Sequence, residues 1–314
     1  IAAVLVFDNS LRMQYVHENK SHFDRARELA AWLLGQLPAD CPVAVVDRAT
    51  PYGGRDGDRS AAELRLERLT TASAARPLAD ALRDAADWLR GQPDYRGEIY
   101  VFTDMAAIDW SPETLADFNA RLQELPGAKV YLIDVGKDAP RNLALAPLRL
   151  SAEELTPGSL LRIETDLSAT GNDAAHGDLT VELYTQNASG GVDKRGQQVV
   201  TVDDGSTPIE FSIAGLDLGT HQGYVQVVGG DPLASDDIRY FTVDVREPRK
   251  ILLLGQATAD TLFLREALAP STAASVLRSK FVCESRRYTQ LDETPLADFD
   301  AVCLVDPPPL PSAA

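Results

Sequence analysis

The first part of the chain alternates between two hydrophobic patterns. Continuous apolar runs of strand length occur at residues 1–8 (IAAVLVFD), 41–47 (CPVAVVD), 97–104 (GEIYVFTD) and 128–136 (AKVYLIDVG). Such runs are typical of strands that are covered on both faces. Between them, apolar residues recur at helical spacing over residues 21–37, 60–69, 77–91 and 111–125. Strands that alternate with helices predict an α/β fold with a doubly wound, mostly parallel sheet over residues 1–143.

The pattern changes after Pro147, where the helical period disappears. Six short segments of alternating polar and apolar residues follow, separated by Gly, Asn and Asp, and they predict an antiparallel β-sandwich over residues 147–247. Buried-strand and helix patterns return with ILLLGQ and TADTLFLREAL, which predicts the start of a second α/β domain over residues 249–314. We expect that domain to be incomplete, and the chain to be a piece of a longer protein.

Charge excludes some classes of partner. The chain has 314 residues, a formal net charge of −17 and a pI near 4.6. Such a chain repels phosphate backbones and anionic lipid surfaces, so we expect no nucleic-acid partner. No apolar run approaches the ~18 residues that span a bilayer. Any membrane association is therefore expected only through segments outside this fragment.

Two aspartates follow predicted strands where open α/β sheets place their sites, beyond the carboxyl ends of the strands. Asp8 begins DNSLRM, and Asp104 lies in VFTDMAAIDW. In this strand–helix order the pair resembles the von Willebrand factor A (vWA) domain. In that family a first strand ends in Asp-x-Ser-x-Ser, a later loop supplies a threonine and a later strand a second aspartate, and together they bind a divalent ion, usually magnesium. The resemblance implies that Asp8, Ser10 and Asp104 are metal ligands.

Two positions depart from the vWA pattern. Arg12 replaces the second serine, and in AARPLADAL Arg76 stands where the family has threonine. Arginine has no lone pair for a metal, so we expect guanidinium–carboxylate ion pairs in place of magnesium. A shifted alignment would instead supply a hydroxyl from the segment that holds Thr70, Thr71 and Ser73. A simpler interpretation is that the two aspartates cap the helices that follow them or pair with nearby arginines.

The resemblance extends beyond the site. DNSLRMQY, FDRARELAAWLL and IYVFTDMAAIDW are similar to the vWA part of bacterial BatA-like membrane proteins, in which a β-sandwich, here Ig-like, follows. GYVQVVGGDPLASDDIRYFTVDV resembles the end of that sandwich, and the last segment resembles a truncated glutamine amidotransferase-like fold. The resemblance implies a tethered protein on the extracytoplasmic side of a bacterial cytoplasmic membrane.

Other candidate sites are weaker. Asp231, Asp236 and Asp237 could hold calcium, but their order matches no EF-hand loop, and a polar hairpin turn explains them better. Cys303 lies inside a strand pattern with no histidine after it, so an amidotransferase site is not expected. His17 and His22 lie in a polar stretch and are expected to be solvated.

Three classes of function remain. The first is a non-catalytic protein-interaction or scaffold module that uses the face carrying Asp8, Ser10, Arg12, Arg76 and Asp104. The second is an adhesive receptor that needs magnesium, and the third is an enzyme with its site in the incomplete last domain. The two arginines favour the first class over the second, and the missing Cys–His pair favours it over the third. No cofactor is expected, and the protein partner is not identified by the sequence.

Overall fold

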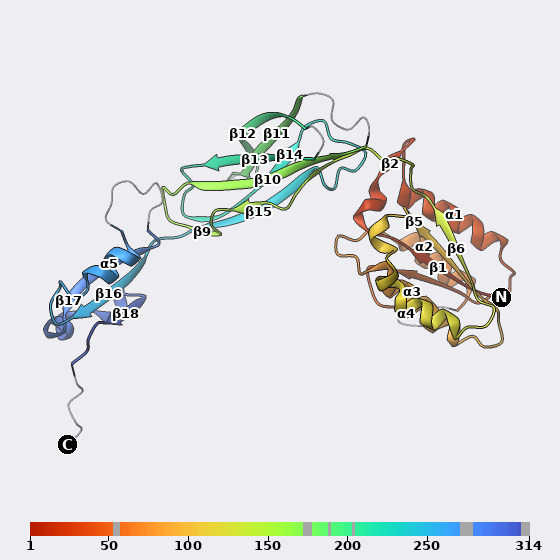
Figure 1. Cartoon of the computed structure of the whole chain (residues 1–314), viewed down its shortest axis with the longest axis horizontal. Coiled ribbons are helices and arrows are strands. Elements are labelled where there is room, and N and C mark those ends of the chain that lie inside the picture. Colours follow the sequence, from red (N-terminus) through yellow and green to blue (C-terminus); the bar gives the residue numbers. More distant parts are fainter. Residues whose placement is uncertain (53–56, 172–177, 188–189, 203–204, 271–278, 309–314) are drawn as a thin grey trace, which may run out of the picture. The chain divides into compact units, whose positions relative to one another are not determined.

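The structure, a computed structural model, describes residues 1–52, 57–171, 178–187, 190–202, 205–270 and 279–308. It is a mixed α/β structure with several sheets (Figure 1). The first sheet is parallel and has the strand order β4-β1-β5-β6. Its strands are β1 (Ala2–Phe7), β4 (Val43–Asp47), β5 (Gly97–Thr103) and β6 (Lys129–Asp134). The small hairpin β2 (Val16–His17) and β3 (Lys20–Ser21) precedes the first long helix.

Helices cover both faces of this sheet, which explains why β1 and β4 are buried along their whole length. One core contains apolar residues of α1 (His22–Gln36) and α2 (Arg59–Arg68) with Leu5 and Phe7. The other contains residues of α3 (Leu78–Arg90) and α4 (Pro112–Gln123) with Val4 and Val6. Successive strand residues point to opposite faces, so β1 supplies both cores. The edge strand β6 is more exposed.

Strand register decides which residues meet at the carboxyl edge. Phe7 pairs with Asp47 of β4 and with Phe102 of β5. The rings of Phe7 and Phe102 stack with their centroids 4.8 Å apart. The residues that follow these three positions therefore leave the sheet at the same level, on adjacent strands. This places the loops after β1, β4 and β5 side by side.

Residues 142–245 form two further sheets. One has the order β13-β10-β7, with β8 also pairing β10, and the other has the order β12-β11-β14-β15-β9. The strands are β7 (Asn142–Leu145), β8 (Arg149–Leu150), β9 (Glu154–Leu155), β10 (Leu161–Thr170), β11 (Asp178–Gln186), β12 (Val192–Thr201), β13 (Ser206–Ile213), β14 (Gly219–Val227) and β15 (Ile238–Val245). Phe211 of β13 packs over Gly196 of β12, where a Cβ would lie 3.0 Å from its ring, so the two sheets contact each other there. The sequence pattern did not predict the short strands β7, β8 and β9.

The last segment has a sheet of its own. β16 (Arg249–Gly255) lies between β17 (Phe281–Arg287) and β18 (Ala301–Leu304), and all three strands are parallel. The described residues between β16 and β17 contain one helix, α5 (Leu262–Leu268). Residues 271–278 and 309–314 of this predicted domain lie outside the described residues.

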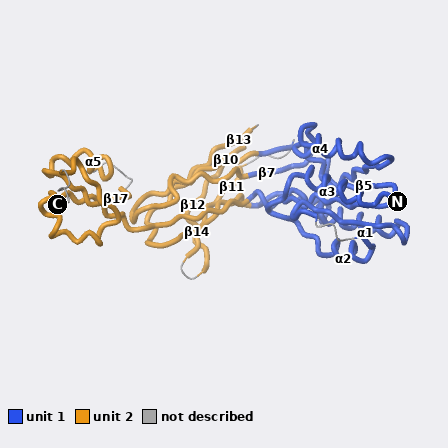
Figure 2. Tube along the Cα trace, turned by 90° about the horizontal axis from the view of Figure 1, so that it is seen from below, with its two compact units in different colours: residues 1–144, 169–175, 229–237 blue, residues 145–168, 176–228, 238–314 orange. Residues whose placement is uncertain are grey.

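The chain divides into two compact units (Figure 2). The first contains residues 1–144 with 169–175 and 229–237, and the second contains residues 145–168, 176–228 and 238–314. The second unit thus includes the last parallel sheet as well as strands of the two sheets within residues 142–245, whereas the sequence predicts three domains. None of the helices in the described ranges is both long and apolar enough to cross a membrane.

Candidate functional site

Three loops meet at the carboxyl edge of the first sheet. The loop after β1 carries Asp8 and the short 3-10 helix η1 (Leu11–Gln14), and the loop after β5 carries Asp104 and the 3-10 helix η2 (Ala107–Asp109). Asn9 connects the β1 loop to its neighbours, because its side chain accepts a hydrogen bond from the Arg48 amide at 2.9 Å and donates one to the carbonyl of Thr70 at 2.9 Å. The loops are therefore fixed to each other by side-chain and backbone bonds.

Five charged side chains occupy the centre of this edge, and we call them the charge cluster: Asp8, Arg12, Arg48, Asp104 and Asp109. Arg48 Nη1 lies 2.9 Å from Asp8 Oδ1 and 3.1 Å from Asp109 Oδ2. Arg12 Nη2 lies 3.3 Å from Asp8 Oδ2 and 2.5 Å from Asp109 Oδ2, and its Nε lies 3.3 Å from Asp104 Oδ2. Three carboxylates thus surround two guanidiniums.

Burial differs between the two arginines. The side chain of Arg48 is 7% exposed and that of Arg12 is 35% exposed. Burial lowers the pKa of Arg12, but the charges of Asp104 and Asp8 outweigh it, so the pKa is raised from its ordinary value. Asp8 is fully buried. Buried charges require partners of opposite charge, and the two guanidiniums supply them for Asp8.

Arg12, which the sequence analysis assigned to this site, lies within ion-pair distance of Asp8, Asp104 and Asp109. The expectation that Arg76 pairs with the aspartates is wrong. Its Nη2 lies 3.0 Å from Asp84 Oδ2 and donates to the carbonyl of Thr50 at 2.8 Å. Arg76 lies just before α3, and Asp84 lies about two turns into that helix, so the guanidinium of Arg76 pairs with a carboxylate that is close in the sequence. Its backbone still contributes, because its carbonyl accepts a hydrogen bond from Arg48 Nε at 2.6 Å.

Arg48 and Asp109 are the members of the cluster that the sequence interpretation missed. Arg48 directly follows β4, which is the neighbour of β1, so the same carboxyl-end rule that selected Asp8 would have selected it. For Asp109 no sequence signal was available, since it follows Asp104 by five residues in an irregular segment. Its position depends on the turn that η2 makes after β5.

The residues at this edge do not fit a divalent metal ion. Ser10 Oγ is buried and has no hydrogen-bond partner among the described residues, so by itself it would be available as a metal ligand. However, both oxygens of Asp8 already face guanidiniums. Thr71 Oγ1 accepts a hydrogen bond from Gln14 at 2.7 Å, and Thr70 and Ser73 are exposed. Positive groups therefore lie where a cation would need to bind.

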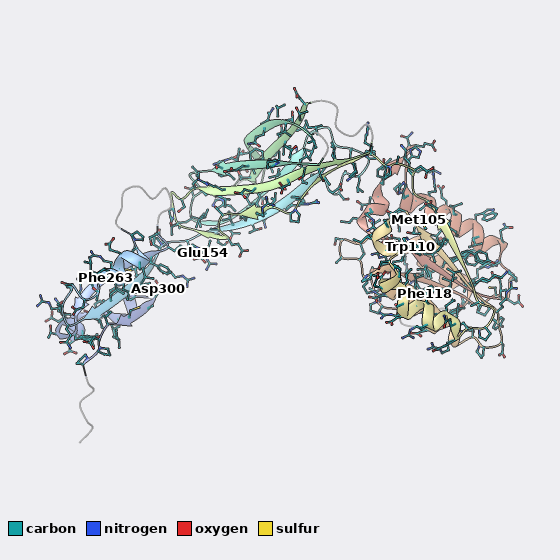
Figure 3. The ribbon with its side chains drawn as sticks, in the orientation of Figure 1. Met105, Trp110, Phe118, Glu154, Phe263 and Asp300 are labelled. Atoms are coloured by element: carbon teal, nitrogen blue, oxygen red, sulfur yellow. The ribbon has the colours of Figure 1, made fainter. Side chains whose placement is uncertain are left out.

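Exposed apolar side chains lie next to the charge cluster. Met105 is 36% exposed and Ile108 is 76% exposed, and both belong to the loop after β5. That loop is held by hydrogen bonds from the Met105 amide to Thr103 Oγ1 and from the Ala106 amide to Asp104 Oδ1, each 3.2 Å long. Met105 has a φ of 57°, a left-handed conformation that is uncommon for a residue other than glycine. Figure 3 labels Met105 together with Trp110 of the same loop.

The other candidate sites are also placed by the structure. Among the described residues, Asp231, Asp236 and Asp237 form a group whose oxygens lie within 4.8 Å of one another. Asp231 uses its two oxygens to accept from the amides of Leu143 and Leu233, as a turn-forming aspartate does. Cys303 lies in β18, and the structure gives it no disulfide.

Comparison with solved structures gives distant likenesses. No protein-family model matches the sequence, and no curated protein matches it. Among solved structures, a von Willebrand factor type A protein from Catenulispora acidiphila has 15% identity and a TM-score of 0.34, covering 78% of this chain and 66% of that chain. A CARDB domain from Pyrococcus furiosus has 11% identity and a TM-score of 0.30, covering 35% of this chain and 96% of that chain. A β-glucosidase from Erythrobacter marinus has 11% identity and a TM-score of 0.27, covering 78% and 47%. Likenesses this low carry no argument about function.

Proposed function

We propose that the carboxyl edge of the first sheet is a protein-binding face, and that the first domain is a non-catalytic interaction module of the vWA type. In this proposal the charge cluster replaces the metal ion of the family. It holds the three loops together without a cofactor, and the loops present a fixed surface to a partner. The chain is then a scaffold and not an enzyme.

One observation carries the proposal. Arg12 and Arg48 lie between Asp8, Asp104 and Asp109, at the point where the loops after β1, β4 and β5 meet. Ion pairs inside a protein cost desolvation energy and are weak evidence for stability alone, so their use to fix loop geometry is a hypothesis for this chain. Met105 and Ile108 add exposed apolar area beside the cluster. Protein interfaces combine apolar side chains with surrounding polar groups, and Met105 and Ile108 beside the charge cluster provide both kinds of group.

The resemblance of the sequence supports a wider proposal. We infer that the chain belongs to a BatA-like protein, that residues 147–247 are its Ig-like sandwich, and that residues 249–314 begin an amidotransferase-like domain. The same resemblance supports tethering to a bacterial cytoplasmic membrane on its outer side. Protease treatment of intact spheroplasts that carry the full-length protein would test this, since degradation of the domain requires it to lie outside.

The experiment for the binding face is site-specific photo-crosslinking in the full-length protein. A photoreactive amino acid replaces Ile108 in one sample and Leu64 of α2 in another, because Leu64 is also exposed, at 47%, but belongs to a helix on one face of the sheet. We expect a discrete cross-linked protein from position 108 only, and the same product in the presence of EDTA. Equal products from both positions would contradict the proposal. A product that EDTA abolishes would support the metal-dependent receptor instead.

A further inference from the structure

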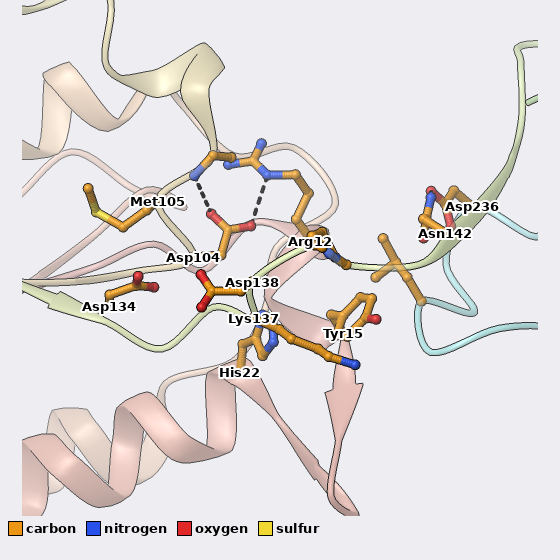
Figure 4. A pocket seen from close by; sticks show the side chains of 14 residues that line it. Arg12, Tyr15, His22, Asp104, Met105, Asp134, Lys137, Asp138, Asn142 and Asp236 are labelled. Atoms are coloured by element: carbon orange, nitrogen blue, oxygen red, sulfur yellow. Dashed lines mark hydrogen bonds and ion pairs between the residues drawn. The ribbon is translucent and has the colours of Figure 1, made fainter. Parts of the chain in front are cut away.

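A pocket of about 500 Å³ lies beside the charge cluster, and all of its lining residues belong to the first unit (Figure 4). Its walls come from the loops after β1, β5 and β6, from the first residue of α1, and from residues 233 and 236. Pockets that hold small ligands commonly have volumes of about 300–1,000 Å³. The pocket is thus large enough for a group that enters from a partner.

His22 is a buried polar residue in the pocket wall that lacks a partner. It was expected to be solvated, but it is 5% exposed, and neither of its ring nitrogens has a hydrogen-bond partner in the described structure. The ring of Tyr15 stacks on it with the centroids 5.0 Å apart. Burial lowers the pKa of His22, so the imidazole is neutral at pH 7 and one ring nitrogen carries a lone pair. An unsatisfied buried acceptor of this kind is unfavourable unless it serves a ligand.

Asn142 supplies a second acceptor. Its Nδ2 donates to Asp236 Oδ2 at 2.8 Å. A carboxylate accepts only from a donor, so this bond fixes the amide orientation and leaves Oδ1 as the free end. Asn142 Oδ1 is buried and accepts no hydrogen bond from any described residue. Asn142 Oδ1 and the unprotonated ring nitrogen of His22 are therefore acceptors for a ligand that donates hydrogen bonds, while the other ring nitrogen of His22 is an N–H donor that also lacks a partner among the described residues.

The charges that line the pocket also favour a ligand that donates hydrogen bonds, and one that is cationic. Four aspartates line it, namely Asp104, Asp134, Asp138 and Asp236, against the cations of Arg12 and Lys137. Arg12 is already committed to the carboxylates of the charge cluster. Lys137 is exposed and, within the described part of the chain, forms no ion pair, so its side chain is able to move aside. The pocket is left with an excess of negative charge.

We propose that this pocket receives the side chain of an arginine or a lysine from the protein partner. The cationic group donates to His22 and Asn142 and pairs with Asp134 and Asp138, while the aliphatic stem contacts Met105, Pro140 and Leu233. The inference rests on the proposed function, since it assigns a chemistry to the partner of the same face. A net charge of −17 on the chain also favours a basic partner.

Lys137 lines the same pocket as His22, so an entering cation meets a like charge unless the Lys137 side chain moves aside. If the pocket binds cations, variants of Lys137 and His22 should change cation binding, whereas a pocket with a purely structural role predicts no such change. Lys137→Ala removes a like charge and opens the rim, so it should tighten the binding of cations. His22→Phe keeps the stacking on Tyr15 and removes the acceptor, so it should weaken binding while the melting temperature rises.

The experiment is an NMR titration of the chain with n-propylguanidinium and n-butylammonium, which represent the two side chains, and with butyrate as the anionic control. The histidine ring signals are followed. For so few ligand atoms a Kd of about 1 mM is expected, with no binding of butyrate. Asp138→Asn should raise the Kd about threefold, as loss of one partly exposed ion pair does. Asp94→Asn removes the same charge at the amino edge of the sheet and should change nothing.

The inference is overturned if neither cation shifts the histidine signals, if butyrate binds as well, or if Asp138→Asn and Asp94→Asn behave alike. It is also overturned if His22→Phe leaves the Kd unchanged. No partner protein is needed for these titrations. Failure of the photo-crosslinking experiment would therefore leave their outcome unaffected, and failure of the titrations would leave the binding face itself untouched.

Discussion

Arg48→Met is the most informative single change in the charge cluster. It removes the guanidinium that lies 2.9 Å from Asp8 Oδ1 and 3.1 Å from Asp109 Oδ2, in a side chain that is only 7% exposed. Asp8 then keeps one ion pair, at 3.3 Å to Arg12, and one hydrogen bond from the Ser10 amide. Removal of one partner of a buried pair costs about 3–5 kcal/mol of unfolding free energy, because the remaining charge stays buried. That is a large part of the ~5–15 kcal/mol that stabilises a typical domain.

Two further variants serve as references for the loss of unfolding free energy in Arg48→Met. Arg12→Met removes three ion pairs, one more than Arg48→Met, but from a more exposed side chain, and solvent screening should limit its cost to about 1–2 kcal/mol. Arg90→Met removes surface pairs to Asp87 and Glu124 and should cost less than ~1 kcal/mol. Asp8→Asn combined with Arg48→Met should cost less than the sum of the single changes, since each single change leaves the other group unpaired.

Urea unfolding followed by tryptophan fluorescence measures these differences. The chain has three tryptophans, Trp32, Trp88 and Trp110, and all of them lie in the first unit. The signal therefore reports the unit that contains the cluster. A loss below ~1 kcal/mol for Arg48→Met, or a loss for Arg12→Met that equals it, would refute the assignment of Arg48 as the central cation, because burial would then not set the cost.

Three other predictions do not depend on the arginine variants of the cluster. Millimolar magnesium or manganese should leave the melting temperature unchanged, and EDTA should have no effect; an upward shift that Asp8→Ala abolishes would restore the metal-binding interpretation. The free energy of unfolding should fall as the pH falls below 6.5, the ordinary pKa of histidine, because the unfolded chain binds a proton that buried His22 does not. In denaturant titrations, His22→Phe should remove this part of the pH dependence. Gly223→Ala should lower the free energy of unfolding by about 1–3 kcal/mol, since its Cβ would lie 2.4 Å from the Tyr184 carbonyl oxygen. Gly35→Ala has open space in α1 and should raise it by ~0.5–1 kcal/mol. Calorimetry that ranks the two variants otherwise would show that the local packing is misassigned.

Local sequence patterns predicted many of the strands and helices of the first unit. The apolar run over residues 1–8 predicts β1, and the spacing of Phe23, Ala26 and Ala30 predicts α1, because strand and helix periods are properties of neighbouring residues. The carboxyl-end rule placed Asp8 and Asp104 at one edge. Arg12 was added because it stands where the vWA motif that begins at Asp8 has its second serine. The short strands β7, β8 and β9 were missed, since two to four residues show no period.

The composition of the charge cluster was decided by tertiary structure. Arg48 reaches Asp8 because the parallel register sets Asp47 beside Phe7, a pairing between residues forty positions apart. Asp109 joins them through the irregular turn after β5, while Arg76 pairs with Asp84 of the helix that follows it. A guanidinium can form an ion pair with any carboxylate within reach, so the presence of an arginine in the sequence does not tell which aspartate it pairs with. Burial does, because a charge that is removed from water at this edge must be met by whichever opposite charges the meeting loops bring within a few ångströms.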